Sequence, residues 1–403
     1  MKRKNLNETI LLSHGGGGEE MNRLINETIF AAFDNEILRA NNDSAILNLN
    51  LDAGAGFDRA APSSALNSAA SFGGELAFST DSFVVTPLFF NGGDIGKIAV
   101  CGTVNDLAMV GAKPLFLSCA LIIEEGLSLS ELRRILDSMA STARSCGVRI
   151  VCGDTKVVPR GKCDKIFINT SGIGRVLRPA RVQNIKAGAK ILLSGDIGRH
   201  GAVILAARDE IALSSELQSD CKPLCAAVEK LISQGVKIQA MRDATRGGLS
   251  AVLNEFASSS GLEFLVREED IKISDEVVGV CELLGFEPYE LANEGTFVAI
   301  VEDDAEADRA LDILREFDAN AAIIGEVREV GHDKGEFKGT LMPKLGTRDE
   351  SMGARSDAGA VSENRAGQFQ APYAAKGRVI LQNAYGSQRF LELPKGELLP
   401  RIC

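Results

Sequence analysis

The chain has 403 residues, of which 45% are hydrophobic and 25% charged, which leaves room for roughly two or three domains and a large core. Its formal net charge of -11 argues against nucleic acid and against an anionic membrane as the main partner. The 9 cysteines form no C-x-x-C pair and only 3 histidines are present, so neither a zinc knuckle nor a disulfide framework is indicated. No apolar run approaches the ~18–20 residues of a membrane span, and none follows the basic N-terminus as in a secretory signal. We expect a soluble, cytoplasmic protein with reduced thiols.

The first 40 residues predict a glycine-rich segment and a helix. The N–H groups of Gly15–Gly18 could fold over a phosphate, but a flexible linker is the simpler interpretation. Residues 21–38 carry apolar side chains at helical spacing, and residues 43–49 predict a short strand. Ala53–Gly73 is rich in Ala, Ser and Gly, and we expect a mobile surface insertion there.

Residues 41–178 predict a first unit of mixed helices and strands. Ser128 and Glu131 have the spacing of a capping box ahead of an amphipathic helix that Gly147 closes. The strand at 148–152 is expected to deliver Gly153-Asp154-Thr155-Lys156 as the segment that follows it. The other expected elements are strands at 75–85, 114–123 and 166–173 and a helix at 95–110.

The pattern restarts after residue 178, so we assign residues 179–330 to a second unit. Its expected elements are strands at 190–194, 236–240, 296–301 and 321–327 and helices at 202–207, 249–256 and 305–317. Residues 331–374 are polar and without periodicity, which predicts a flexible insertion. Residues 375–403 then supply a final strand and a mobile tail. The sequence therefore predicts two successive α/β (α+β) units, with neither a P-loop nor a Rossmann fingerprint.

Several acidic residues stand where the chain leaves or interrupts an expected strand. Taken singly, each such aspartate is more often a helix cap or a turn former. Asp81 is harder to explain in that way, because it interrupts an apolar strand and is costly to bury unpaired. Glycines at Gly92-Gly93, Gly153 and Gly247-Gly248 stand beside three of the acids, where the backbone could approach a triphosphate. Carboxylates that gather at one point suit Mg²⁺, so we infer an Mg–ATP site without a P-loop.

The chain ends on a cysteine, Cys403, which no following residue holds in place. A frayed terminal thiol is the simpler interpretation. The alternative is a swinging arm that carries a reacting sulfur, for which a basic pocket would favour the thiolate. A prenylation signal is excluded, because it needs three residues after the cysteine.

Seven motifs resemble those of the HypE hydrogenase maturation factors, in order and over nearly the whole chain. HypE belongs to the superfamily of aminoimidazole ribonucleotide synthetase and selenophosphate synthetase. The resemblance implies a two-domain fold of that superfamily, in which the N-terminal domain pairs across a homodimer and the C-terminal domain closes over ATP. The motifs are Thr80–Val85, Gly92–Lys97, Gly102–Leu107, Gly153–Val158, Asp243–Leu249, Ala292–Gly295 and Pro400–Cys403.

The resemblance also implies roles for individual residues. Asp43, Asp81, Asp106 and Asp243 match the carboxylates that bind the metal and the triphosphate. Asn105, Gly153, Asp154, Thr155 and Gly247 match further positions of the nucleotide site. Glu294 and Lys156 match a pair implicated in dehydration, and Cys403 matches the modified cysteine.

The implied reaction is an ATP-dependent dehydration on the tail, with Mg²⁺ as the metal. A HypF-type carbamoyltransferase loads Cys403, dehydration converts the thiocarboxamide to a thiocyanate, and a HypC–HypD complex receives the cyano group for the iron of [NiFe]-hydrogenase. Asp196 and Arg199 depart from the turn expected in the family, which leaves a role for His200 open.

Two other functions stay open. The first is a phosphotransferase of the same superfamily that acts on a free small molecule. A selenophosphate synthetase should carry a cysteine in its N-terminal segment, yet none precedes Cys101, and the other members have no use for a C-terminal cysteine. The second is a nucleotide-binding scaffold without turnover.

Overall fold

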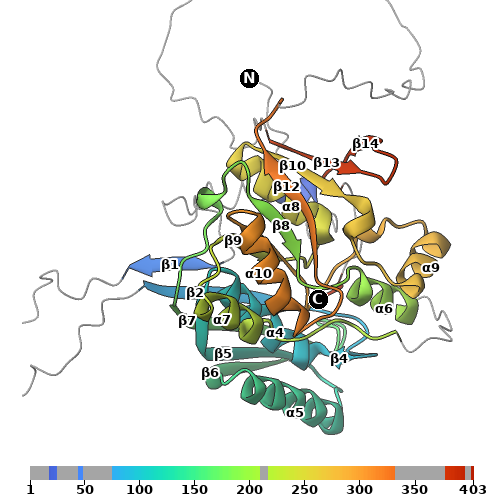
Figure 1. The fold of residues 1–403 in the computed structure, drawn as a ribbon. Coiled ribbons are helices and arrows are strands. Elements are labelled where there is room, and N and C mark those ends of the chain that lie inside the picture. The colour runs from blue at the N-terminus through green and yellow to red at the C-terminus, as the bar shows by residue number, and fades with distance from the viewer. Residues whose placement is uncertain (1–17, 25–43, 49–74, 209–216, 332–376, 395–400) are drawn as a thin grey trace, which may run out of the picture.

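A computed structural model describes residues 18–24, 44–48, 75–208, 217–331, 377–394 and 401–403 (Figure 1). Most of the glycine run, most of the helix predicted at 21–38, Asp43, the insertion predicted at 53–73 and residues 332–374 of the second predicted insertion lie outside these residues. None of the helices in the described part of the chain combines the length and the hydropathy that crossing a bilayer requires.

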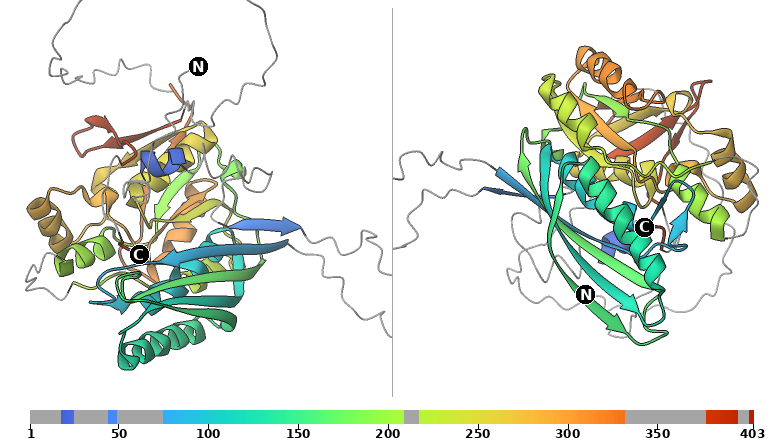
Figure 2. Two further views of the ribbon diagram at one scale, coloured as in Figure 1. Left: turned by 180° about the vertical axis from the view of Figure 1, so that it is seen from behind. Right: turned by 90° about the horizontal axis from the view of Figure 1, so that it is seen from below.

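The N-terminal unit is a five-stranded sheet with helices on one face (Figures 1 and 2). Its strand order is β1 (Ala45–Asn48), β2 (Glu75–Phe83), β7 (Ile166–Val176), β5 (Ala112–Glu124) and β6 (Arg149–Val158). All neighbours are antiparallel except β5 and β6, which run parallel. The first helix of the described residues, α1 (Glu19–Leu24), hydrogen-bonds from the Glu19 N–H to the Pro394 carbonyl.

Helix α4 (Ile95–Met109) lies on this sheet and is buried along nearly its whole length. It begins at Asp94, whose carboxylate accepts hydrogen bonds from the Gly96 and Lys97 N–H groups. Helix α5 (Leu129–Ser145) packs against α4 so closely that a Cβ on Gly96 would lie 2.4 Å from the Ile135 carbonyl oxygen. Two short strands, β3 (Phe89–Phe90) and β4 (Gly93–Asp94), form a hairpin ahead of α4.

The C-terminal unit is a seven-stranded sheet between two layers of helices. Its strand order is β14 (Gln388–Phe390), β13 (Arg378–Gln382), β10 (Glu263–Arg267), β12 (Ala322–Arg328), β8 (Lys190–Leu193), β11 (Phe297–Val301) and β9 (Ile238–Asp243). Leu192 on β8 packs with α7 (Cys225–Ser233) and α10 (Asp304–Arg315). Its neighbours Ile191 and Leu193 pack with α8 (Gly248–Ser260) on the opposite face, as the two-residue period of a strand requires.

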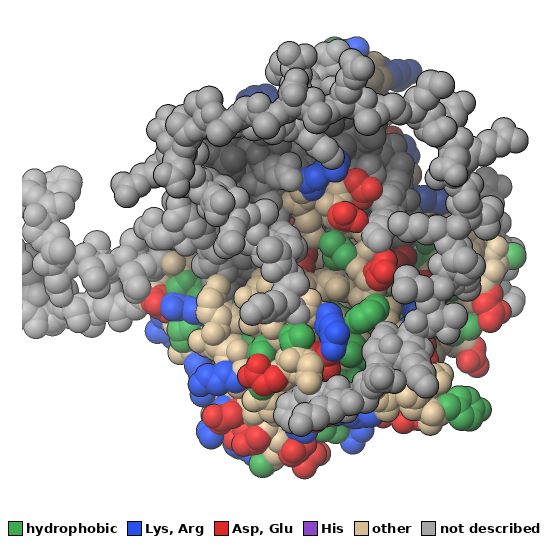
Figure 3. Space-filling view, turned by 90° about the horizontal axis from the view of Figure 1, so that it is seen from above, with side chains coloured by type: hydrophobic (Ala, Val, Ile, Leu, Met, Phe, Trp, Pro, Cys, Tyr) green, Lys and Arg blue, Asp and Glu red, His purple; other side chains and the backbone are tan. Residues whose placement is uncertain are grey.

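Two further helices, α6 (Arg199–Arg208) and α9 (Asp275–Leu284), pack together at the end of the C-terminal sheet. Short 3-10 turns occupy Val182–Asn184, Glu268–Asp270 and Pro288–Glu290. On the face seen in Figure 3, acidic and basic side chains of the described residues are interspersed rather than gathered by sign.

The two units share one hydrophobic core, because α4 of the first packs against α7 of the second. This core includes Ile98 and Val104 from α4 and Val228 and Leu231 from α7. Asn105 adds polar links: its side-chain N–H donates to the Lys222 carbonyl at 3.2 Å, and its carbonyl accepts from the Leu224 N–H at 2.8 Å. The described chain is therefore one continuous body, with the C-terminus between the two units (Figure 1).

Most predicted elements are confirmed to within a few residues, and so is the α/β class. The capping box of Ser128 and Glu131 is present with both of its hydrogen bonds. Two predictions are wrong. Gly153–Lys156 does not follow a strand but lies inside β6, and Asp81 does not interrupt β2, which continues through it. Helices α7 and α9 and strands β10 and β14 were not predicted from the sequence.

Candidate functional site

The last three residues lie inside the protein, between the two units. Ile402 is 2% exposed and Cys403 9% exposed. The Val84 N–H donates to a terminal oxygen of Cys403 at 2.9 Å, and the Thr86 N–H donates to the Arg401 carbonyl at 3.2 Å. Val84 therefore pairs with Cys403 and Thr86 with Arg401, and the two segments run in opposite directions, as in an antiparallel strand pair.

Side chains hold the same segment from both units. Arg401 forms an ion pair with Asp164 and donates from Nε to the Val84 carbonyl at 3.1 Å. Arg208 on α6 donates to the Arg401 carbonyl and, at 2.8 Å, to the Thr86 carbonyl. The tail is thus fastened by main-chain and charged contacts, which leaves the Cys403 side chain to face the interior.

Acidic side chains from distant parts of the chain act on the Cys403 thiol. Asp81 comes from β2, Asp243 from the end of β9, and Glu294 from the loop before β11; each acts on the thiol electrostatically. Asp106 on α4 accepts a hydrogen bond from the Ser79 hydroxyl at 2.6 Å and acts electrostatically on Arg246, a cation that Cys403 also affects. We call these four carboxylates, with Cys403, the tail site.

Arg246 is the cation within the tail site. Its pKa is raised, first by Cys403 and then by Asp81, Glu294 and Asp106, while its burial acts in the opposite direction. The site therefore gathers acidic groups around one guanidinium group, whereas a basic pocket is what would favour the Cys403 thiolate.

This surplus of carboxylates changes the protonation of the site. The pKa of Glu294 lies well above its ordinary value, because the side chain is 3% exposed and acidic neighbours add to the effect of burial. Its Oε1 has no hydrogen-bond partner among the described residues. Burial likewise raises the pKa of Asp81, which Arg246 and the Ser82 N–H partly offset. Burial also raises the pKa of the Cys403 thiol, with Arg246 again opposing the rise. In this position, the protein favours the neutral thiol over the thiolate.

The loop that carries Glu294 is fixed through its backbone. The two carboxylate oxygens of Asp220 accept hydrogen bonds from the Glu294 N–H at 3.1 Å and the Gly295 N–H at 2.9 Å. The approach is so close that a Cβ on Gly295 would lie 1.9 Å from the Asp220 carbonyl oxygen. Asn293 is fully buried and bonds to the Gly198 N–H and the Ala244 carbonyl. The position of Glu294 is therefore set by neighbouring loops rather than by its own side chain.

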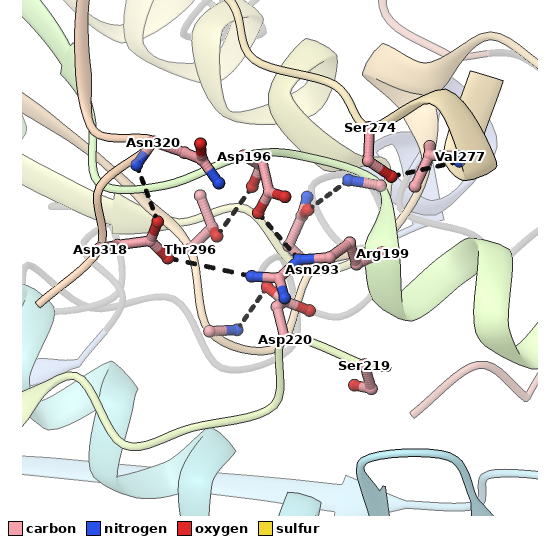
Figure 4. A network of polar contacts seen from close by, with 12 residues as sticks. Asp196, Arg199, Ser219, Asp220, Ser274, Val277, Asn293, Thr296, Asp318 and Asn320 are labelled. Carbon is pink, nitrogen blue, oxygen red and sulfur yellow. Dashed lines mark hydrogen bonds and ion pairs between the residues drawn. The ribbon is translucent and has the colours of Figure 1, made fainter. Parts of the chain in front are cut away.

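A network of ion pairs and hydrogen bonds joins Asp196, Arg199 and Asp318 near Asp220 and Asn293 (Figure 4). Arg199 pairs with Asp196 at 2.8 Å and lies 3.9 Å from Asp318, which in turn binds Lys222 at 2.7 Å. The two residues that depart from the expected family turn thus pair with each other. Lys222 follows Asp220 closely, so the network holds the segment that positions Glu294.

Several predicted site residues lie elsewhere in the structure. Gly153, Asp154, Thr155 and Lys156 sit on β6, the exposed edge strand, where Lys156 pairs with Asp154 at 2.9 Å. A Cβ on Gly153 would lie 2.1 Å from the Cys119 carbonyl oxygen, so this glycine is required for strand pairing. Asn105 links the two units, as described above.

Gly247 is the residue before α8 and has a φ of 77°, which favours glycine. It turns the chain directly after Arg246, and so helps to place that guanidinium in the tail site. Asp43 lies outside the described residues.

The tail site suits a divalent cation that is shared with a nucleotide. Among the described residues, no three metal-ligating side chains converge closely enough to hold an ion by themselves. Carboxylates outnumber cations here, and one buried carboxylate oxygen has no donor among the described residues. These are nevertheless the oxygen-rich surroundings that Mg²⁺ prefers. Phosphate oxygens would then have to complete the coordination.

Three residues of the site were not assigned from the sequence. Arg246 lies inside the motif Asp243–Leu249, but its positive charge alone did not indicate a role. Asp220 lies in a segment without periodicity, and His200 was left open. The signal that could have found them is their interaction with Cys403, with the Ile402 carbonyl or with the Glu294 N–H, which only the fold creates.

Comparison with known proteins identifies the family. Residues 65–176 and 186–338 match the N-terminal and C-terminal domains of the AIR synthase related proteins. The chain is 41% identical to a carbamoyl dehydratase HypE of Rhodobacter capsulatus over 98% of both chains. It is 40% identical to the corresponding protein of Escherichia coli strain K12, over 98% of this chain and 99% of the relative.

The chain belongs to the HypE family of carbamoyl dehydratases. Two solved HypE structures share its fold at 38% identity. One is a HypE–HypF complex, with a TM-score of 0.72 over 92% of this chain and 99% of the solved one. The other is HypE in complex with ATP, with a TM-score of 0.69 over 98% and 100% of the two chains. The predicted family is thereby confirmed.

Proposed function

We propose that this chain is an ATP-dependent carbamoyl dehydratase that acts on a thiocarboxamide carried by its own Cys403. The observation that carries the proposal is the burial of Cys403 together with Glu294, whose Oε1 has no hydrogen-bond partner among the described residues. HypE relatives named carbamoyl dehydratases, and a HypE structure solved with ATP, support it.

The raised pKa of the Cys403 thiol separates carbamoylation of the tail from the dehydration that follows. A thiolate is the nucleophile that accepts a carbamoyl group, yet the inserted position raises the pKa of the Cys403 thiol. Loading therefore takes place with the tail outside, on a HypF-type carbamoyltransferase, as the HypE–HypF complex of a relative suggests. The loaded sulfur bears a neutral amide, which the acidic site can accept.

Within the site the chemistry needs an activated amide oxygen and a base. The carbonyl oxygen of the S-carboxamide attacks the γ-phosphorus of ATP and ADP leaves. Glu294 then removes a proton from the amide nitrogen. The carbon–oxygen bond breaks, phosphate departs, and loss of the second N–H proton leaves a thiocyanate on Cys403. The sum is thiocarboxamide plus ATP giving thiocyanate, ADP and phosphate. A raised pKa makes Glu294 a stronger base than a solvated carboxylate.

The remaining groups of the tail site would balance the negative charge of the triphosphate and of the leaving phosphate. Arg246 faces both Cys403 and the acids, so it can balance negative charge that develops on the leaving phosphate. Mg²⁺ held by Asp81, Asp106 and Asp243, and by Asp43, would screen the triphosphate. Asp220 fixes the backbone at Glu294 and so helps to place its side chain in the tail site.

Lys156 requires a second copy of the chain. It lies on exposed β6 and pairs with Asp154 rather than with Glu294. Exposed apolar residues on the same strand include Val151 at 59% and Val157 at 69%. We infer that β6 lies in a homodimer interface and that Lys156, with Asp154 and Thr155, serves the nucleotide site of the partner. A HypC–HypD complex would receive the cyano group.

The test is the intact mass of the C-terminal peptide. Incubation with a HypF-type enzyme, carbamoyl phosphate and ATP should add a carbamoyl group and then remove one water. Cys403→Ala should bind nucleotide but show neither change. ATP hydrolysis with a carbamoylated peptide that never loses water would favour a scaffold. Phosphate transfer to an added small molecule would favour the other superfamily activities.

A further inference from the structure

His200 lies at the point where the inserted tail meets the loop next to Glu294. It is the second residue of α6 and is completely buried. Its Nε2 lies 2.7 Å from the Ile402 carbonyl oxygen, and its Nδ1 lies 2.8 Å from the Ser219 hydroxyl. The Phe90 ring packs edge-on against the imidazole at 5.3 Å between centroids, which fixes the ring plane.

These contacts determine which nitrogen carries the proton. The Ile402 carbonyl can only accept, so Nε2 must bear the hydrogen. Burial lowers the pKa of His200 and so favours the neutral ring, in which Nδ1 is an acceptor when Nε2 carries the hydrogen. The Ser219 hydroxyl therefore donates to Nδ1. The same Ser219 oxygen accepts from the Cys221 N–H at 3.1 Å.

Both ends of this chain of hydrogen bonds reach functional groups. At one end, the Ile402 carbonyl directly precedes the Cys403 residue that carries the substrate. At the other end, Ser219 precedes Asp220, whose carboxylate holds the Glu294 and Gly295 N–H groups. The Ser219 N–H also donates to the Asn91 carbonyl at 2.9 Å, which ties the loop to the N-terminal unit.

We propose that His200 is a positioning residue for the dehydration: it holds the tail inserted through the Ile402 carbonyl and links that position to the loop that aims Glu294. This inference rests on the proposed function for its second part only. The first part, retention of the tail, concerns the protein alone.

Retention predicts how fast Cys403 reacts with a thiol reagent. The buried thiol reacts only from the released tail, so the alkylation rate reports the released fraction. Loss of one net hydrogen bond should raise that rate by about five- to tenfold. Glutathione added in trace amount to every sample serves as the internal reference for reagent reactivity.

Three substitutions of His200 separate its two contacts. His200→Ala removes both. His200→Gln can place an N–H where Nε2 lies and so keeps the bond to Ile402. His200→Asn reaches only the Nδ1 position, near Ser219. Val203→Ala, one turn along the same helix and 4% exposed, is the control for general loosening of α6.

The experiment uses full-length protein and iodoacetamide, with mass spectrometry of the C-terminal peptide cleaved after Glu397. We expect fast alkylation of Cys403 in His200→Ala and His200→Asn, and slow alkylation in wild type, His200→Gln and Val203→Ala. Equal rates in wild type and His200→Ala, or equal acceleration by Val203→Ala, would overturn the proposal.

A second measurement tests the link to Glu294. After carbamoylation, His200→Ala should lose water about tenfold more slowly than wild type, and His200→Gln should recover most of the rate. Wild-type speed in His200→Ala would remove this part of the proposal. If the wild-type chain itself loses no water, the proposed function fails, while the alkylation result still decides the retention of the tail.

Discussion

Glu294→Gln is the substitution that tests the chemistry most directly. Gln keeps the size and shape of the side chain and leaves the backbone bonds to Asp220 in place. It removes only the ability to take a proton. We expect dehydration of a carbamoylated Cys403 to fall by about 10²- to 10⁴-fold, the usual contribution of a positioned general base. Carbamoylation and nucleotide binding should stay close to wild type.

The same substitution should make the protein without metal and nucleotide more stable. Glu294 is buried among acids and its Oε1 finds no donor in the described residues, so its ionised form is costly. Relief of such a group is worth about 1–3 kcal/mol. Because burial raises the pKa of Glu294, the folded protein binds a proton more readily than the unfolded chain. Stability from this group is therefore greatest below the ordinary pKa of glutamate and declines as pH rises through the raised value.

Rate and stability can be measured on the same preparations. Water loss from the C-terminal peptide gives the rate, and thermal unfolding gives the stability as a function of pH. Glu290→Gln is a matched control, since Glu290 is half-buried in the same segment and is not one of the tail-site carboxylates. In wild type, the rate of dehydration should fall on acidification, and the midpoint of that fall should lie above the ordinary pKa of glutamate. Dehydration at the wild-type rate in Glu294→Gln would refute the assignment of the base.

Three further outcomes follow from the geometry. Asp81→Asn should reduce ATP turnover at least tenfold because it removes a carboxylate from the metal's surroundings, yet raise the thermal midpoint of the metal-free protein; a calorimetric scan without magnesium checks the second effect. Val157→Glu should convert a dimer to a monomer in light scattering, since it puts a charge on the exposed edge strand, and an unchanged mass would exclude β6 from the interface. Arg401→Ala should accelerate alkylation of Cys403 several-fold through loss of the ion pair with Asp164 and the bond to Val84, whereas Arg401→Lys should do so less.

The sequence predicted best those elements whose signals are local. The box of Ser128 and Glu131 defined the start of α5, and Leu249 with Phe256 defined the buried side of α8. The acid-rich site could also be predicted from the sequence, because Asp81, Asp106 and Asp243 lie in motifs that resemble those of the family. Their convergence on Cys403 was expected only from the resemblance.

Predictions failed where tertiary contacts override local pattern. Gly153 and Asp154 have the composition of a turn, yet pairing with β5 extends β6 through them to Val158. Asp81 was expected to break a strand, but a carboxylate whose side chain leaves the sheet costs the ladder nothing. Residues such as Asp220 and His200 act through groups more than 70 positions away, and no spacing rule encodes such contacts.

The way the tail binds makes chain length itself a determinant. Val84 and Thr86 bind the main chain of Cys403 and Arg401, and these bonds fix the register of the segment. The Arg401 side chain adds its own contacts with Asp164 and Val84. One residue added at the end would either leave its carboxylate without room or shift the register, and a shift by one turns every side chain to the opposite side. The main-chain pairing with Val84 and Thr86 therefore determines where the Cys403 sulfur lies.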